Sequence, residues 1–306
     1  MTKDLNLKTG YLCNNNCLFC AQADNKSYGN PSVDDLIAEM TKASEYCNKV
    51  IFTGGEPTIR KDILTLIKRA KALGFERLQL QSNVRRLSSR EFCCDLISAG
   101  INEFAPSLHG HNQELHDMHT CRPGSFSETT KALENLGELK QYVITNTVIT
   151  SYNYKFLPDI ARLLLSYGVA QIQFAYVHSV GNGQTNMDRL APKMTMVLPY
   201  LFTALQTALE GNIKCMAEAF PPCLMGQYRK YCSEQFMPDV EIRDTHYIDP
   251  DFGTTRRTKS KVKPVRCKPC LFNGSCEGTW SEYIAKFGDE ELLPFTDSSQ
   301  ITFCEK

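Results

Sequence analysis

The chain has 306 residues, which is enough for one large α/β domain or two domains of medium size. Its 34 basic and 34 acidic residues cancel, which argues against a broad electrostatic surface for nucleic acid or an anionic membrane. No apolar run approaches the roughly 20 residues that span a bilayer, and the polar N-terminus lacks the apolar core of a secretory signal. We therefore expect a cytoplasmic protein whose partners include neither a membrane nor nucleic acid.

From about residue 7 to residue 220, short runs with strand character alternate with amphipathic helical segments. The first helix follows Ser32, a favourable N-cap residue, and two later helices end at Gly74 and Gly100. The predicted strands are residues 7–12, 49–55, 77–83, 101–110, 142–150, 170–178 and 212–220. The predicted helices are residues 33–46, 61–73, 88–99, 125–139, 153–167 and 194–209.

Six consecutive strand-then-helix units predict a parallel sheet, because parallel neighbours need helical crossovers. We predict the α/β class, with a partial (β/α)6 TIM-like barrel over residues 1–220, and an open doubly wound sheet is the alternative. In either arrangement ligands bind at the carboxyl ends of the strands. Residues 221–306 are predicted to form a small iron–sulfur domain, because this loop-rich segment has too few apolar residues to fold by burial alone.

The composition is unusual in its fourteen cysteines. A disulfide framework is not expected in the cytoplasm, where thiols are kept reduced, and clusters at both ends of the chain indicate metal or iron–sulfur ligation. Cys13, Cys17 and Cys20 follow the first strand with the spacing C-x3-C-x2-C. Three thiolates on a four-iron cluster leave one iron open for another ligand. A structural zinc, or a cluster with a distant fourth cysteine, is the alternative.

This cysteine motif, with Phe19 before its last cysteine, resembles that of the radical S-adenosylmethionine (SAM) superfamily. Residues 54–57 at the end of the second strand, Gly-Gly-Glu-Pro, resemble the GGEP element of the same superfamily, and the likeness covers roughly the first 220 residues. It implies that the three cysteines hold a [4Fe–4S] cluster whose fourth iron is chelated by the amino and carboxylate groups of SAM. It also implies that one electron from the reduced cluster cleaves SAM, usually to a 5′-deoxyadenosyl radical that abstracts hydrogen.

Further residues are candidates for contacts with SAM. The glycine pair allows backbone carbonyls to approach a ligand closely, and Glu56 is expected to anchor its turn. Arg122 can pair with the SAM carboxylate through a bidentate fork, although a surface role is an equal alternative. Gln173 is predicted to face the same cavity. The residues predicted to bind SAM are Phe19, Gly54, Gly55, Glu56, Ser82, Asn83, Ser107, Arg122 and Asn146. Capping and surface roles are expected for His109, His111, His116 and His119.

A second set of cysteines has the spacing C-x2-C-x5-C and resembles the core of the C-terminal auxiliary-cluster domains of radical SAM enzymes. The full SPASM form has a fourth cysteine where this chain has Trp280, so the likeness favours the shorter Twitch form with one auxiliary [4Fe–4S] cluster. A four-cysteine zinc site is the alternative. The expected ligands are Cys223, Cys267, Cys270 and Cys276, with Cys215, Cys232 and Cys304 in reserve.

The leading interpretation is a radical SAM enzyme with two [4Fe–4S] clusters, acting on a small molecule or peptide and reduced by a donor such as flavodoxin or ferredoxin. Only twelve residues precede the first cysteine, which favours a small molecule, a short peptide or a separate recognition protein. The alternatives are a maturase of ribosomal peptides, transfer of an aminocarboxypropyl radical from SAM, and a non-catalytic iron–sulfur or zinc scaffold. The basic run 256–261 is expected to be a solvated loop or a contact for an anionic substrate.

Overall fold

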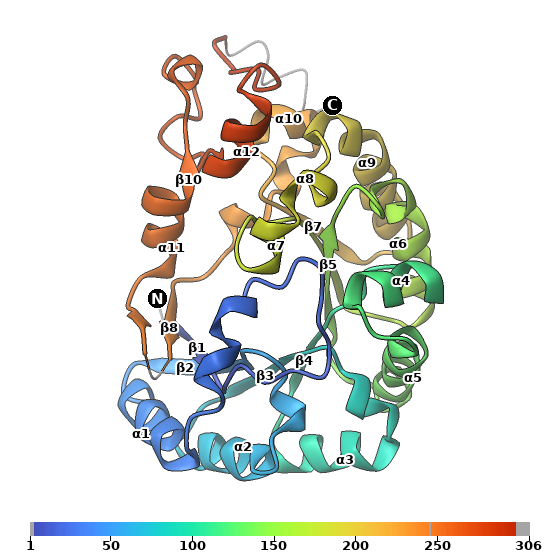
Figure 1. Cartoon of the computed structure of the whole chain (residues 1–306), viewed down its shortest axis with the longest axis vertical. Coiled ribbons are helices and arrows are strands. Elements are labelled where there is room, and N and C mark those ends of the chain that lie inside the picture. The colour runs from blue at the N-terminus through green and yellow to red at the C-terminus, as the bar shows by residue number, and fades with distance from the viewer. Residues whose placement is uncertain (1–2, 245, 298–306) are drawn as a thin grey trace.

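The computed structural model describes residues 3–244 and 246–297. Seven parallel strands follow one another in chain order around the interior, and helices cover their outer side in an arc (Figure 1). The predicted partial TIM-like barrel is thereby confirmed. The strands are β1 Lys3–Lys8, β2 Cys47–Thr53, β3 Arg77–Ser82, β4 Glu103–Pro106, β5 Ile144–Ile149, β6 Gln171–Tyr176 and β7 Lys214–Glu218.

The helices of the barrel begin and end where the local sequence supplies caps. The Ser32 hydroxyl accepts a hydrogen bond from the Asp35 amide at the start of α1, and Ser89 does the same for Phe92 in α3. Gly100 ends α3 with a φ of 134°. The helices are α1 Val33–Ala43, α2 Ile63–Ala72, α3 Arg90–Ala99, α4 Gln113–Thr120, α5 Ser125–Glu138, α6 Leu157–Ser166, α7 Asn182–Thr185, α8 Met187–Leu190 and α9 Met194–Glu210.

Alternation along the strands separates an apolar outer face from a more polar interior. In β1, Leu5 and Leu7 are fully buried, whereas Asn6 and Lys8, which alternate with them, are only partly buried. β4 and β5 continue the sheet through parallel bridges, one of which joins Ser107 to Asn146. The carboxyl ends of all seven strands therefore surround one end of the barrel, which is where ligands are expected.

The C-terminal segment runs along the side of the barrel between α9 and β1 (Figure 1). Its strand β8 pairs in parallel with β1 and so extends the barrel sheet, an arrangement that the sequence did not predict. The pairing aligns Asp4 with Val240, far apart in the chain. The elements of this segment are α10 Pro222–Met225, β8 Val240–Arg243, β9 Ile248–Asp249, α11 Phe252–Thr255, β10 Lys261–Val262, β11 Thr279–Trp280 and α12 Ser281–Phe287.

The predicted fourth strand, residues 101–110, is shorter than expected, at Glu103–Pro106. The end of the first strand and the loop at residues 113–120 are also predicted wrongly. The first strand was predicted at residues 7–12 but ends at Lys8, because Gly10 adopts a φ of 136° and turns the chain into the cysteine loop. Residues 113–120 were read as loop but form α4, whose first turn is capped when the Asn112 side chain accepts a hydrogen bond from the Leu115 amide.

Candidate active site

The loop that carries the first three cysteines is fastened to the end of β2. The Gly55 amide donates to the Gly10 carbonyl at 2.8 Å, and the Glu56 amide donates to the Leu12 carbonyl at 2.9 Å. Figure 1 shows this loop, in blue, crossing the middle of the molecule beside α7. The cysteines are therefore placed by backbone hydrogen bonds between two strand ends.

The glycine pair is required for this contact. A Cβ on Gly54, whose φ is 127°, would lie 2.2 Å from the Gly10 carbonyl oxygen. A Cβ on Gly55 would lie 2.3 Å from the Leu12 carbonyl oxygen and 2.5 Å from the Tyr11 carbonyl oxygen. Both distances are shorter than real Cβ contacts, so any other residue would push the cysteine loop away. The pair thus serves the contact between two backbones as well as lining the cavity described below.

The Glu56 carboxylate joins the ends of two strands. One oxygen accepts hydrogen bonds from the Thr58 amide and hydroxyl and from the Ser82 hydroxyl, and the other accepts from the Asn83 amide at 2.7 Å. Glu56 is 2% exposed, and its carboxylate is fully occupied by these donors. The side-chain amide of Asn83 donates a hydrogen bond to the side-chain oxygen of Asn14 at 2.7 Å. Glu56 therefore anchors its turn, as the sequence suggested, and Ser82 takes part in that anchor.

Arg85 is a functional residue that sequence reasoning missed. It is buried, and its guanidinium donates to the Asn14 carbonyl at 2.8 Å and to the Asn15 side chain at 3.0 Å while pairing with Glu128 on α5. The preceding Val84 has a φ of 53°, which turns the chain towards the loop. An arginine three residues after a strand carries no local signal of such a role.

A second missed contact comes from the other side of the barrel. The Asn182 side chain at the start of α7 donates to the Cys17 carbonyl at 2.8 Å, and its amide donates to the Cys20 carbonyl at 3.0 Å. The Asn186 side chain donates to the Leu18 carbonyl at 2.8 Å. A Cβ on Gly181 would lie 2.4 Å from the Cys20 carbonyl oxygen. The cysteine loop is thus held between the turn after β3 and the segment after β6.

The three cysteines line one cavity of about 250 Å³ at the carboxyl ends of the strands. Thr53, Gln81 and Val148 contribute its walls from three different strands or strand ends. The structure brings together most of the predicted site residues here. Those that line the cavity are Cys13, Cys17, Cys20, Phe19, Gly54, Gly55, Ser82, Asn83, Ser107 and Asn146.

Three predicted residues lie outside this lining: Glu56, which anchors its turn as described above, Arg122 and Gln173. Arg122 is exposed just beyond the C-terminus of α4, so the predicted pairing with the SAM carboxylate has no support from the geometry. The Gln173 side chain donates to the Glu218 carboxylate on β7. The register aligns Gln173 with Asn146, so both side chains are on the same face of the sheet. The Gln173 side-chain amide is nevertheless engaged in its hydrogen bond to Glu218.

The donor set fits a cationic iron–sulfur cluster. Burial raises the pKa of the Cys13 thiol to about 11 and raises that of Cys17 further, and neighbouring thiolates add to both shifts. Three thiolates in such surroundings need compensating positive charge, which iron ions supply. The Asn15 amide already donates to the Cys13 sulfur at 3.3 Å, the kind of contact that tunes a bound cluster.

Three of the four clustered histidines brace Phe19. His109 contacts the Phe19 ring edge at 4.6 Å between centroids, and the His109 ring nitrogen accepts from the Val148 amide. The His116 ring in turn accepts from the His109 amide at 3.1 Å. Burial holds the pKa of His109 well below its ordinary value and lowers that of His116 to about 4. The expected surface role is wrong for these residues and for His119, because all three are buried and uncharged at neutral pH.

The second set of cysteines also meets in space. Cys223, Cys267, Cys270 and Cys276 line one small cavity with mainly apolar neighbours. Burial, with smaller contributions from the thiolates of the other three cysteines, raises the pKa of Cys223 to about 11, as expected of four sulfurs within electrostatic range. Within the described ranges no three His, Cys, Asp or Glu side chains are arranged to hold a single metal ion. The donor set itself is the one that a four-cysteine cluster uses.

The reserve cysteines are placed differently. Cys215 is 1% exposed within β7 and does not line this cavity. Cys232 is buried, its thiol lies 3.5 Å from the Phe220 carbonyl oxygen, and it lines a neighbouring cavity. Cys304 lies outside the described residues. Cys223 is the candidate that the geometry supports as the fourth ligand.

A model of the Radical SAM superfamily matches residues 7–164, which is more than half of the chain. The chain belongs to the radical SAM superfamily. As a member of that superfamily it is an enzyme, and the family implies a [4Fe–4S] cluster and SAM as cofactors. No helix in the described parts of this radical SAM protein is long and apolar enough to cross a lipid bilayer.

Relatives with curated names are similar over part of their length. The AdoMet-dependent heme synthase of Oleidesulfovibrio alaskensis is 31% identical over 161 residues, which is 52% of this chain and 41% of the relative. The probable GTP 3′,8-cyclase of Sulfurisphaera tokodaii is 26% identical over 61% of this chain and 59% of the relative. The matches thus span about half the length of these relatives, so their activities do not transfer directly.

Among solved structures, SuiB of Streptococcus suis bound to S-adenosylmethionine is similar over 97% of this chain and 77% of its own, with a TM-score of 0.66. SuiB has also been solved bound to its precursor peptide SuiA, and that structure has a TM-score of 0.63. At 16% and 14% sequence identity these likenesses show the fold. They extend over the C-terminal segment as well as the barrel.

We expect Gly55→Ala to loosen the cysteine loop. The new methyl group would meet two backbone carbonyls, which cannot move without breaking the Gly10 contact, and overpacking of this kind costs about 1–3 kcal/mol. Urea unfolding of the variant should show this loss, and its iron content per chain should fall. Gly274→Ala is the control, because nothing lies within 4 Å of a Cβ at that position. Equal stability and iron content in both variants would contradict the account.

Stability should fall on mild acidification because of the buried histidines. Their folded-state pKa values lie below the ordinary 6.5, so the unfolded chain binds protons first as the pH drops from 7.5 to 5.5. The free energy of unfolding should therefore decrease over this range, by up to about 1.4 kcal/mol per pH unit for each such histidine. His116→Gln should flatten the dependence, whereas His246→Gln at an exposed position should not. Parallel curves for all three proteins would refute the assignment.

Proposed function

We propose that this enzyme cleaves SAM reductively at the first cysteine set and uses the 5′-deoxyadenosyl radical to abstract hydrogen from a small molecule or a peptide. One observation carries the proposal. Three thiols, the glycine pair and polar strand ends line the same cavity, and the family assigns this combination to SAM chemistry. A cluster bound there supplies one electron to the carbon–sulfur bond of SAM.

The residues of this chain have defined tasks in that reaction. Cys13, Cys17 and Cys20 hold three irons and leave the fourth for the amino and carboxylate groups of SAM. Gly54 and Gly55 present backbone without side chains at the edge of the cavity, where the SAM amino group can donate to carbonyls. The remaining contacts to SAM are assigned to the other cavity residues, Phe19, Ser82, Asn83, Ser107 and Asn146. Glu56 acts indirectly, because it holds Ser82 and Asn83 in place.

The assignment of Asn146 as a SAM contact has the most direct structural support. Its side-chain oxygen is buried and has no hydrogen-bond partner in the part of the chain that the structure describes. Such an oxygen costs free energy until a donor reaches it, and SAM carries hydroxyl and amino donors. Asn146 also lines the cavity directly, at the point where β5 meets Ser107 of the neighbouring strand end.

We further assign residues 221–306 to an auxiliary domain of the Twitch type, with one [4Fe–4S] cluster held by Cys223, Cys267, Cys270 and Cys276. Four thiol ligands leave no iron free for substrate, which supports a role in electron transfer to or from the substrate. Flavodoxin or ferredoxin is the proposed external electron donor. The cavity shared by the four thiols is the support for this assignment.

We propose a peptide rather than a small molecule as the substrate class, and the likeness in fold to SuiB supports this choice. The SuiB structure with a bound precursor peptide matches along the whole of this chain, including its C-terminal segment. Transfer of an aminocarboxypropyl group from SAM and a non-catalytic metal scaffold are the competing functions. The products of SAM separate these possibilities.

Anaerobic incubation of the reconstituted protein with SAM and dithionite should release 5′-deoxyadenosine, measured by liquid chromatography with mass detection. Cys17→Ala should abolish the release, because two thiolates cannot hold the cluster that binds SAM. Cys94→Ala removes an exposed cysteine outside both sets and should leave the rate unchanged. Methylthioadenosine as the product would instead identify aminocarboxypropyl transfer, and the absence of any nucleoside would identify a scaffold.

Cys223→Ala should change the electron paramagnetic resonance signal of the second cluster and lower the iron content, while the signal of the first cluster stays intact. Loss of one thiolate opens an iron to solvent and alters the symmetry of the site. Cys215→Ala is the matched control, since Cys215 is buried away from the four thiols. If Cys215→Ala rather than Cys223→Ala alters the second signal, the ligand set proposed here is incorrect.

A further inference from the structure

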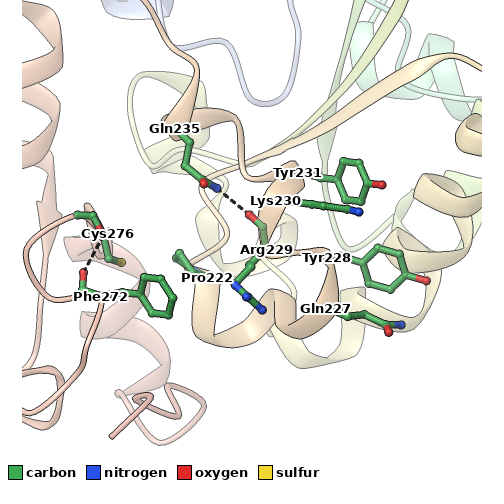
Figure 2. A pocket seen from close by; sticks show the side chains of 10 residues that line it. Pro222, Gln227, Tyr228, Arg229, Lys230, Tyr231, Gln235, Phe272 and Cys276 are labelled. Atoms are coloured by element: carbon green, nitrogen blue, oxygen red, sulfur yellow. Dashed lines mark hydrogen bonds between the residues drawn. The ribbon is translucent and has the colours of Figure 1, made fainter. Parts of the chain in front are cut away.

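Two cavities lie beside Cys276, one of the four cysteines of the second set. The outer cavity has a volume of about 530 Å³, which is in the range of ligand pockets in proteins. Figure 2 shows Arg229 facing Phe272 across it. The inner cavity has a volume of about 100 Å³. The two linings share Pro222, Ser275 and Cys276, so the outer cavity continues into the inner one.

The carboxylates of the inner cavity already have cationic partners. The Lys261 ammonium lies 2.7 Å from a Glu234 oxygen and 2.9 Å from a Glu277 oxygen, and its side chain is 1% exposed. Arg256 binds both oxygens of Glu277 at 2.7 and 2.8 Å. Among the residues that the structure describes, Glu234 and Glu277 are the only carboxylates that line the inner cavity, and none lines the outer one. A ligand in either cavity therefore meets only acidic groups that are already neutralised.

The basic run at residues 256–261 is divided between a buried and an exposed role. The prediction of a solvated loop is wrong at both ends of the run, because carboxylates elsewhere in the chain enclose Arg256 and Lys261. Arg257, by contrast, is exposed and lines the inner cavity. Its guanidinium donates to the Thr254 hydroxyl at 3.1 Å, which is a contact with a neutral group. Arg257 is thus placed to meet an anion that enters the cavity.

Further cations line the outer cavity. Arg229 and Lys230 both contribute to its lining, and Lys230 is exposed. The Lys230 ammonium lies 5.3 Å from the centre of the Tyr231 ring, which is a neutral neighbour. With Arg257 and Lys261, the described lining of the joined cavities holds four cations and two carboxylates, an excess of two positive charges. An anionic ligand would balance this excess, and a cationic ligand would add to it.

The rest of the lining favours a peptide over a small anion. The cations are distributed over both cavities, and the outer cavity alone is larger than a single carboxylate or phosphate would fill. Gln227 and Ser275 are exposed on the lining, and their amide and hydroxyl groups can form hydrogen bonds with a peptide backbone. Pro222 and Phe272 add apolar surface. Several carboxylates carried along one chain suit this arrangement.

We propose that the joined cavities bind an acidic segment of the peptide substrate, whose carboxylates pair with Arg229, Lys230 and Arg257. The inference rests on the proposed function, because it names the substrate class of the same enzyme. It places the bound segment against Cys276, and therefore beside the second cysteine set. Because these three cations are partly or largely exposed to solvent, salt should weaken the interaction.

Isothermal titration calorimetry of the holoenzyme tests this with short acetylated and amidated peptides. The probes are heptapeptides in which glycine alternates with three glutamates, three glutamines or three lysines. The glutamate peptide should bind at least about tenfold more tightly than the glutamine peptide, because several partly exposed charge pairs are lost together. The lysine peptide should bind more weakly than either. Raising the salt concentration from about 0.05 M to about 0.5 M should remove most of the preference for glutamate.

Charge variants locate the binding site. Lys230→Gln and Arg257→Gln remove one exposed cation from each cavity, and each should weaken the glutamate peptide by about threefold or more without affecting the glutamine peptide. Lys268→Gln is the matched control, because Lys268 is an exposed cation of the same segment that lines neither cavity. Ser275→Phe, at an exposed position on both linings, should block the glutamate peptide.

Three results would overturn the proposal. They are equal affinity for the glutamate and glutamine peptides, tight binding of the glutamate peptide to Ser275→Phe, and an equal loss of affinity in Lys268→Gln and the two cavity variants. The last result would show that the peptide responds to the overall charge of the protein and not to this site.

The binding test is independent of SAM cleavage. If the holoenzyme releases 5′-deoxyadenosine but shows no preference for the glutamate peptide, the proposed function stands and the substrate class is wrong. If it binds the glutamate peptide selectively but forms no nucleoside product from SAM, the binding site stands and the radical reaction is wrong. Each result identifies which of the two statements has failed.

Discussion

The contact between the Gly54–Gly55 backbone and the start of the cysteine loop is the constraint on which the site depends. It brings two chain segments so close that a single methyl group would separate them. The contact fixes the loop relative to β2, and the loop carries all three thiols of the first set. A cluster held by thiolates can expose one defined iron to SAM only if the thiolates themselves are held in a defined place.

Further contacts from other parts of the barrel hold the cysteine loop in place. Glu56 joins the ends of β2 and β3, Arg85 fastens the loop to the turn after β3, and Asn182 holds it from the segment after β6. The same segment links the two cysteine sets, because the His178 ring before α7 stacks on Trp280 at 4.0 Å. Trp280 therefore connects the cysteine loop to the part of the chain that carries Cys276.

The sequence predicted the barrel and both cysteine sets, because both depend on local patterns. Strand–helix alternation indicates a parallel sheet with helical crossovers, and closely spaced thiols indicate metal or cluster ligation. It did not predict Arg85 or Asn182, whose roles arise only when distant segments meet. β8 was missed because its four residues carry too little apolar pattern, and its pairing with β1 joins opposite ends of the chain. Lys261 was read as solvated because a basic run looks the same whether or not carboxylates elsewhere enclose it.

The central claim is that the three thiols of the cysteine loop leave one iron for the amino group of SAM. Electron–nuclear double resonance of the reduced holoenzyme with SAM labelled by ¹⁵N at that group tests it directly. We predict a ¹⁵N coupling to the first cluster that persists in Cys223→Ala, where only the second cluster is altered. A spectrum without ¹⁵N coupling in the wild-type enzyme, or one whose coupling disappears in Cys223→Ala, would contradict the account.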